Sequence, residues 1–305
     1  MIKNLICMAL FASTLVLTGC GDDEKDDKVI KPVEEVDPPG APPKTWEVDG
    51  WTGKANLKRV FYDDDVAIYY DGDMDPKITW TFKFIGDVWR YLKVVYQCTP
   101  DQRLFATLHG KGGVGTASYY YSDAWDYRNT IICYSDTWDE NQGWAKDLIT
   151  HEMFHVVESV AFGAHSYSAG YGDYPNGIWG DSQFAPIFQY DIYKHFGMEA
   201  NARQWETQMK TSYADKPTPG TYWSLSWFLP IYNNYGKTEV LSGFFKLVGE
   251  HFPADRKLNM GEFVHFFSGA AHADLKTYAV NTFGWTTAYE QELQNAREEF
   301  SMIEY

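Results

Sequence analysis

The 305-residue sequence has few cysteines, no cluster of basic residues and no long apolar run after position 20. Its 42 acidic residues outnumber its 26 lysines and arginines, which gives a formal net charge of −16. This balance argues against a nucleic acid partner, because phosphate backbones are bound by clustered lysine and arginine. We also expect no membrane-spanning helix after position 20, because no later run is apolar for long enough.

Only four cysteines are present, and two of them fall in the N-terminal segment described next. Cys98 and Cys133 are therefore the cysteines of the expected folded part. An oxidising compartment would permit a disulfide between them, and two buried free thiols are the alternative.

The N-terminus has the pattern of a targeting segment, with Lys3 followed by an apolar stretch from Leu5 to Leu17. The stretch ends at positions 17–20 in Leu-Thr-Gly-Cys, which resembles the bacterial lipobox. That resemblance implies a lipoprotein signal peptide at 1–19 and a lipid-modified Cys20. An ordinary signal peptide or a short membrane anchor is the alternative.

Residues 20–44 are acidic and Pro-rich, without aromatic residues or periodicity, and predict a tether. The acidic run resembles the export signal of Bacteroidota surface lipoproteins. We therefore expect an outer membrane lipoprotein exposed at the cell surface and attached to the membrane by its lipid alone. A solvated spacer facing the periplasm is the alternative.

Residues 45–305 are long and apolar enough to form one domain. Residues up to about 140 alternate as strands do, with one helical stretch at 78–96, and residues 141–305 are mostly helical in spacing. This order predicts an α+β fold with a β-rich lobe at about 45–140 and a helical lobe at about 141–305. Among the expected elements are strands at 104–108, 118–121 and 130–134 and helices at 142–162 and 222–235.

A glycine-rich stretch from Gly110 to Gly115 follows the strand expected at 104–108. It lacks the Gly-Lys-Ser/Thr ending with which a phosphate loop places its lysine and its magnesium-binding hydroxyl. The stretch therefore predicts a flexible loop and no nucleotide site.

The chemical signal of the chain is the pentapeptide at 151–155, His-Glu-Met-Phe-His. On a helix, residues four apart lie on one face, so His151 and His155 can direct their rings at one ion while Glu152 borders the same space. The surrounding residues predict a largely buried helix, in which these polar groups would lack solvation without a metal. The pattern therefore indicates a Zn²⁺ site with Glu152 as general base. In the alternative interpretation, His151 and His155 are core or surface histidines that form hydrogen bonds with the backbone.

The motif resembles the zincin superfamily of metallopeptidases. The metzincin extension is absent, because Glu158 and Ala161 stand where that group has its glycine and its third histidine. The chain is more similar to the gluzincins, which take a third ligand from a carboxylate on a following helix, and the matching stretch at 179–185 implies Asp181 as that ligand. The segment at 263–285 also resembles basic-secretory-protein and M60-like secreted peptidases.

Other residues remain alternatives for the third ligand. His165 follows Gly163, where the helix could end and the chain fold back, and Asp173 and Asp191 are further candidates. Asp147 and Glu158 are expected to orient the histidine rings, because they lie one turn away on the same helix. The candidates for stabilising an oxyanion are Tyr222, Tyr232, His251, His265 and His272.

The sequence therefore predicts a monomeric zinc hydrolase, a peptidase that cleaves protein or glycoprotein substrates outside the cell with a metal-activated water and Glu152. The alternative is a glycan- or protein-binding surface lipoprotein with a structural or non-catalytic metal site. It is motivated by the 12 tryptophans and 22 tyrosines of the chain, because aromatic rings stack on sugars.

Overall fold

The computed structural model describes residues 37–50, 53–97, 103–118, 126, 128–162, 178–179, 182–214, 218, 221–254 and 256–305. Residues Ala41–Tyr305 form one compact unit, and the N-terminal unit Met1–Gly40 is described only at 37–40. The predicted signal peptide, Cys20 and Cys98 lie outside the described residues. None of the helices in the described ranges has the length and apolar character needed to cross a bilayer.

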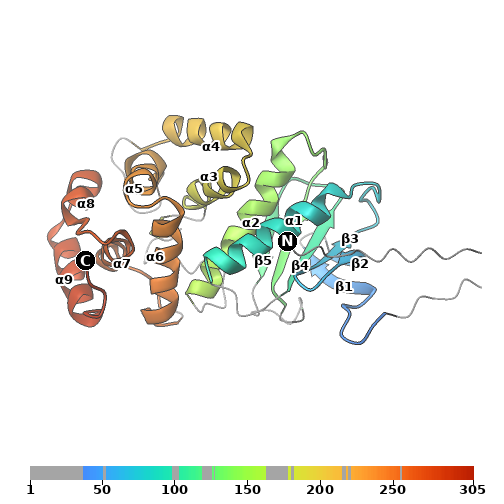
Figure 1. The fold of residues 1–305 in the computed structure, drawn as a ribbon, viewed down its shortest axis with the longest axis horizontal. Helices are drawn as coiled ribbons and strands as arrows, with labels where there is room; N and C mark the ends of the chain where they lie inside the picture. Colours follow the sequence, from blue (N-terminus) through green and yellow to red (C-terminus); the bar gives the residue numbers. More distant parts are fainter. Residues whose placement is uncertain are drawn as a thin grey trace, which may run out of the picture. The chain divides into compact units, whose positions relative to one another are not determined.

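The described strands form one mixed sheet in the order β1-β2-β3-β4-β6-β5 (Figure 1). They are β1 (Thr45–Gly50), β2 (Gly53–Tyr62), β3 (Val66–Tyr70), β4 (Leu104–His109), β5 (Gly115–Ser118) and β6 (Thr130–Tyr134). The β3–β4 and β4–β6 pairs are parallel, and the other pairs are antiparallel. Every residue of β3, β4 and β6 is buried, as expected for central strands covered on both faces.

Two helices, α1 (Trp80–Val95) and α2 (Gly143–Ala161), pack against the sheet. Figure 1 shows α1 beside α2, and α2 contacts β5 and β6. Side chains alternate between the two faces of the strands, so Ile68 and Cys133 join the core that includes both helices. Tyr69 and Phe105 belong to a second, smaller apolar cluster.

The C-terminal part of the unit is helical, as predicted, and the α+β fold is confirmed. Its helices are α3 (Ala185–His195), α4 (Glu199–Thr211), the π-helical turn η2 (Ser224–Phe228), α5 (Leu229–Asn234), α6 (Thr238–His251), α7 (Met260–Ala271), α8 (Lys276–Phe283) and α9 (Thr287–Glu299). The single helix expected at 222–235 is thus two elements. Pro230, at the start of α5, has no N–H to donate to the Ser226 carbonyl one turn before it, and this carbonyl accepts a 2.7 Å hydrogen bond from the Tyr278 hydroxyl instead.

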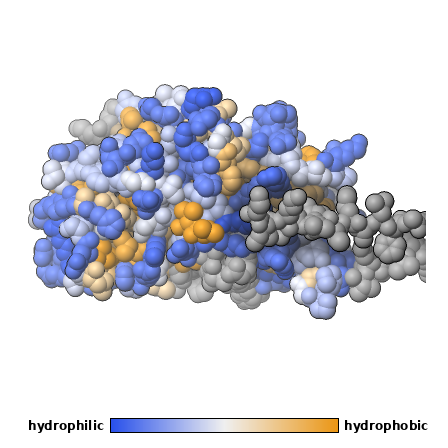
Figure 2. All heavy atoms as spheres, viewed as in Figure 1, coloured by the Kyte–Doolittle hydropathy of each residue, from blue (hydrophilic) through white to orange (hydrophobic). Residues whose placement is uncertain are grey.

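Most large aromatic side chains of this unit lie in its interior. Trp89, Trp179, Trp223 and Trp227 are all fully buried. Figure 2 shows a face covered mostly by hydrophilic residues, with apolar ones in small separate groups. Burial of aromatic rings, which bring the largest apolar areas, therefore accounts for much of the aromatic content of the chain.

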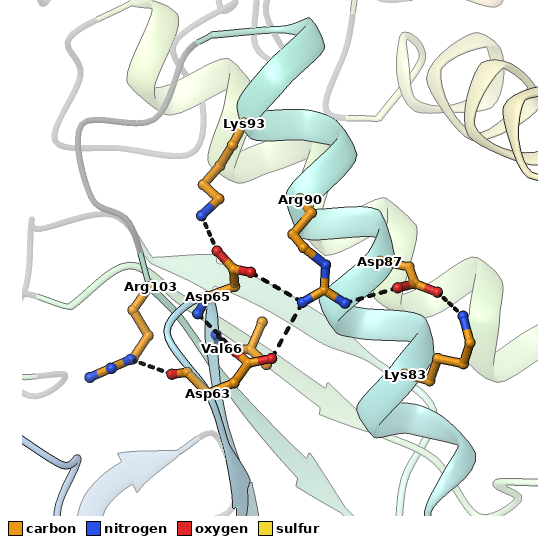
Figure 3. A network of polar contacts seen from close by, with 8 residues as sticks. All are labelled: Asp63, Asp65, Val66, Lys83, Asp87, Arg90, Lys93 and Arg103. Atoms are coloured by element: carbon orange, nitrogen blue, oxygen red, sulfur yellow. Dashed lines mark hydrogen bonds and ion pairs between the residues drawn. The ribbon is translucent and has the colours of Figure 1, made fainter. Parts of the chain in front are cut away.

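Helix α1 is also joined to the turn between β2 and β3 by a network of charged side chains (Figure 3). Asp63 accepts hydrogen bonds from the backbone N–H groups of Asp65 and Val66 and so shapes the turn. Arg90 of α1 pairs with both carboxylates, at 3.3 Å from Asp63 and 3.1 Å from Asp65, and Lys93 also pairs with Asp65. These pairs connect α1 to the β2–β3 turn at the end of the sheet.

Candidate metal centre

Helix α2 carries the predicted motif and lies between the sheet and the helical part, with contacts to β5, β6, α3 and α6. Packing on several sides explains why Glu152, His155 and Glu158 are buried although they are polar. His151 is half-buried. A helix that places three ionisable side chains in the interior needs specific partners for each of them.

The rings of His151 and His155 converge, with their Nε2 atoms 3.2 Å apart. Two ligands at about 2.0–2.1 Å from a tetrahedral zinc are separated by about 3.3 Å, so the donor pair fits such an ion. The same separation fits an N–H···N hydrogen bond between the two rings. Within the described residues, no third His, Cys, Asp or Glu completes a group that could hold a metal.

Glu158 lies behind the His155 ring, as an orienting side chain would. Its Oε2 is 3.1 Å from His155 Nδ1, and its Oε1 accepts a 3.0 Å hydrogen bond from the indole N–H of Trp179. Because an ionised carboxylate only accepts hydrogen bonds, the contact favours a proton on Nδ1. The Nε2 atom of His155 then keeps its lone pair for an ion.

Ser182 is a residue of this centre that the sequence did not indicate. Its hydroxyl lies 3.2 Å from His151 Nε2. Serine is too common a residue for its position to be a signal without coordinates. The predicted ligand Asp181 and the alternatives His165 and Asp173 lie outside the described residues.

Glu152 lies against the edge strand β5. A Cβ added to Gly115 would come 2.4 Å from the carboxylate oxygen Oε1 of Glu152, so the strand approaches this closely only because position 115 is glycine. Position 115 was expected in a flexible loop, but it begins β5. On the neighbouring strand β6, burial and the charge of Glu152 raise the pKa of the Cys133 thiol. Cys133 is a free buried cysteine.

The Asp147 carboxylate lies one turn before His151, but its hydrogen bonds are not with that ring. Its Oδ1 accepts a 2.6 Å hydrogen bond from the Tyr193 hydroxyl and a 2.9 Å bond from the Trp205 indole. Gln189 of α3 donates to the backbone carbonyl of Asp147 at 2.7 Å. The residue joins α2 to α3 and α4, a structural function that the sequence did not indicate.

Asp191, an alternative ligand, lies in a cradle of hydroxyl groups. Its carboxylate accepts hydrogen bonds from Tyr91 at 2.9 Å, Tyr96 at 3.1 Å and Tyr232 at 3.0 Å, and also from Thr238. Its oxygens are therefore engaged away from the two histidines, which argues against a metal-binding role for Asp191.

The oxyanion candidates do not gather at the motif. Tyr232 donates its hydroxyl to Asp191, and His265 contacts the Tyr305 hydroxyl and the Phe300 carbonyl. His272 ends α7 in a left-handed conformation. Among the described residues that line the cleft at the motif, none of the five candidates occurs.

A cleft of about 400 Å³ opens beside His151 and Glu152. One part of its lining consists of Gly113, Val114 and the first residue of β5, and a second part consists of residues of α2. The remaining residues belong to α3 and α4. Its lining residues are Gly113, Val114, Gly115, Trp144, Asp147, Leu148, His151, Glu152, Gln189, Gln204, Trp205 and Gln208.

The α+β fold, with a motif-bearing helix against a mixed sheet and a helical part after it, is similar to the fold of solved zinc metallopeptidases. Two similar solved structures are an M1 zinc metallopeptidase from Deinococcus radiodurans, with a TM-score of 0.51 and 11% identity, and a single-residue mutant of it, with 0.50 and 12%. Each alignment covers 80% of this chain and 52% of the other, so this chain spans about half the length of those enzymes. No protein family model and no curated protein sequence matches the chain.

Proposed function

We propose that this chain is a zinc-dependent peptidase. The observation that carries the proposal is the convergence of His151 and His155 Nε2, 3.2 Å apart on one helix, with Glu152 beside them in the lining of the same cleft. The zincin-like fold adds support, because the similar structures are zinc metallopeptidases. Protein or glycoprotein substrates remain the proposed class.

The residues of the cleft suggest how hydrolysis would proceed. A bound zinc would supply a Lewis acid that lowers the pKa of water toward 7. Glu152 would take the proton of the attacking water and give it to the leaving amine of the peptide. The strand β5 lies at the edge of the described sheet beside Glu152, where an extended peptide can pair with a strand.

Zinc analysis of the purified chain, combined with peptide hydrolysis, tests this function. We expect about one zinc per chain. The Glu152→Gln variant should keep the metal and lose about 10²–10⁴-fold in kcat, because it removes the general base but neither histidine. The His155→Ala variant is the matched control and should lose both. Zinc-free protein from a zinc-replete preparation would refute the metal site, and full activity in Glu152→Gln would refute the mechanism alone.

We propose Asp181 as the third ligand, with His165 as the alternative. Support comes from the residues near Asp181 in the sequence, since Trp179 contacts Glu158 and Ser182 contacts His151. In the same zinc analysis, Asp181→Ala should lose metal while Asp181→Glu retains it, because glutamate keeps a carboxylate donor. Metal loss in His165→Ala but not in Asp181→Ala would reverse the assignment.

A glycan-binding protein without turnover is the second candidate function. The burial of Trp89, Trp179, Trp223 and Trp227 weighs against it, because buried rings offer no platform for sugars. Trp144 is 48% exposed, but it lies in the cleft that contains the motif. Specific retention on a glycan column by a chain that hydrolyses no peptide would favour it.

We also propose that Cys20 is lipid-modified and that the chain is displayed on the outer membrane. The proposal rests on the lipobox-like tetrapeptide and the acidic tether of the sequence. Cys20→Ser should move the protein from the detergent phase to the aqueous phase in a phase-separation assay. External protease on intact cells would then distinguish surface display from a periplasm-facing position.

A further inference from the structure

The cleft extends from the catalytic pair along one face of α2. Trp144, Leu148 and Glu152 follow one another at intervals of four residues, so they share the cleft-facing side of the helix. At about 1.5 Å per residue, Leu148 lies roughly 6 Å and Trp144 roughly 12 Å along the helix axis from Glu152. In the proposed reaction, the peptide bond is cleaved beside Glu152. A long side chain on a residue next to that bond therefore reaches the space over Leu148 and Trp144.

Side chains of α4 border the cleft at the start of α2. A Cβ added to Gly143 would come 3.2 Å from Asn201 Nδ2 and 3.4 Å from Gln204 Oε1, so polar side chains of α4 reach the first turn of α2. The Trp205 indole is fixed by its hydrogen bond to Asp147. The Trp205 ring therefore gives the α4 end of the cleft a wall with a defined position.

The α4 end of the cleft exposes apolar side chains. Trp144 is 48% exposed and Val114, across the cleft, is 45% exposed, and both line the cleft. Exposed apolar side chains that face one another across a cleft indicate a surface covered by a ligand. Flat aromatic rings are the partners that tryptophan binds with defined geometry.

Charge restricts the occupant further. No lysine or arginine lines the described part of the cleft, and the polar groups contributed by α4 include the neutral amides of Gln204 and Gln208. The Asp147 carboxylate already accepts hydrogen bonds from Tyr193 and Trp205. An acidic side chain would find no positive partner in this part of the cleft. Tyr193 and Trp205 both donate to Oδ1 of Asp147, so only the other oxygen of this carboxylate is open to a basic side chain.

We propose that the α4 end of the cleft is a specificity subsite for an aromatic side chain, next to the scissile bond of a peptide substrate. This inference rests on the proposed peptidase function and names its substrate class. Trp144 and Leu148 form the apolar wall, and Trp205 forms the fixed end.

The experiment has two stages with separate outcomes. The zinc-loaded chain is first incubated with a random peptide library, and mass spectrometry of the products identifies the residues that flank each cut. Phe, Tyr or Trp should be enriched at one flanking position. Hydrolysis without such enrichment, or enrichment of a charged residue or of glycosylated serine and threonine, would overturn the subsite while leaving the peptidase function intact. An absence of any hydrolysis would overturn both.

Matched peptides with Phe or Ala at the enriched position then test whether Trp144 contacts the aromatic side chain of the substrate. Trp144→Ala should raise KM for the Phe peptide about 10-fold, with kcat and the Ala peptide changed little, and Trp144→Phe should restore most of the loss. Tyr213→Ala is the control, because Tyr213 is 51% exposed and is not among the residues lining the cleft. An equal loss for both peptides, or the same loss in Tyr213→Ala, would contradict the subsite.

Discussion

Glycine at position 115 determines how close β5 lies to Glu152. The atoms that a new Cβ would meet are the outer atoms of the Glu152 side chain, with Oε1 at 2.4 Å and Cδ at 2.7 Å. A flexible side chain can move aside, so the fold should tolerate a methyl group there. The carboxylate, however, would no longer occupy its present position in the cleft.

We therefore expect Gly115→Ala to lower kcat/KM about 10²-fold, because a shift of about 1 Å in a catalytic group costs that much. Its free energy of unfolding should change by less than about 1 kcal/mol. Kinetics and urea unfolding of the same preparation give both values. Gly113→Ala is the matched control in the same cleft, since its Cβ would meet no atom within 4 Å. Equal activity in the two variants would contradict the role of Gly115.

At the scale of elements, the features that could best be predicted from the sequence are those that depend on the spacing of residues within one segment. The range of α2 and the shared face of His151 and His155 follow from helical periodicity, and the buried strand β4 follows from its apolar run. The close approach of β5 to Glu152 had no such signal, because a glycine in a glycine-rich stretch indicates a loop as readily as a strand. The contact of Ser182 with His151 depends on tertiary packing and could not be predicted.

The connection of α2 to α3 and α4 through Asp147 also exists only in three dimensions. Tyr193 and Trp205 come from two other helices, and both donate to one carboxylate oxygen. Burial raises the pKa of Asp147, and these two hydrogen bonds oppose the increase only in part. The folded state therefore holds the Asp147 proton more tightly than the unfolded state does.

The contribution of Asp147 to stability should consequently fall as pH rises. An aspartate in the unfolded chain titrates near pKa 3.9, about its ordinary value. Below that pH, Asp147 is protonated in both states. As pH rises between the unfolded and the folded pKa, Asp147 ionises in the unfolded state first, and this ionisation favours unfolding. Asp147→Asn keeps an acceptor for Tyr193 and Trp205 and does not titrate. In metal-free protein, the unfolding free energy of wild type relative to Asp147→Asn should decrease as pH rises above about 4 and level off once Asp147 is ionised in the folded state as well. A constant or increasing difference would contradict the assignment.

At the scale of the whole compact unit, one buried carboxylate joins the helix on the sheet to the helical part. Tyr91 and Tyr96 belong to α1 and to the residue after it, whereas Tyr232 belongs to α5. All three hydroxyls donate to Asp191 of α3. Burial, together with the charge of Asp191, raises the pKa of Tyr96 well above its usual value, so this hydroxyl stays protonated and remains a donor.

Removal of this carboxylate should weaken the unit as a whole. Asp191→Ala leaves several buried hydroxyls without their acceptor, and we expect a loss of about 3–5 kcal/mol in the free energy of unfolding. Tyr232→Phe removes a single donor and should cost about 1 kcal/mol. Because the donors come from both the sheet-packed helix and the helical part, tryptophan fluorescence and far-ultraviolet circular dichroism should shift together to lower urea. Separate transitions in Asp191→Ala would mean that the two parts unfold independently and that Asp191 stabilises only one of them.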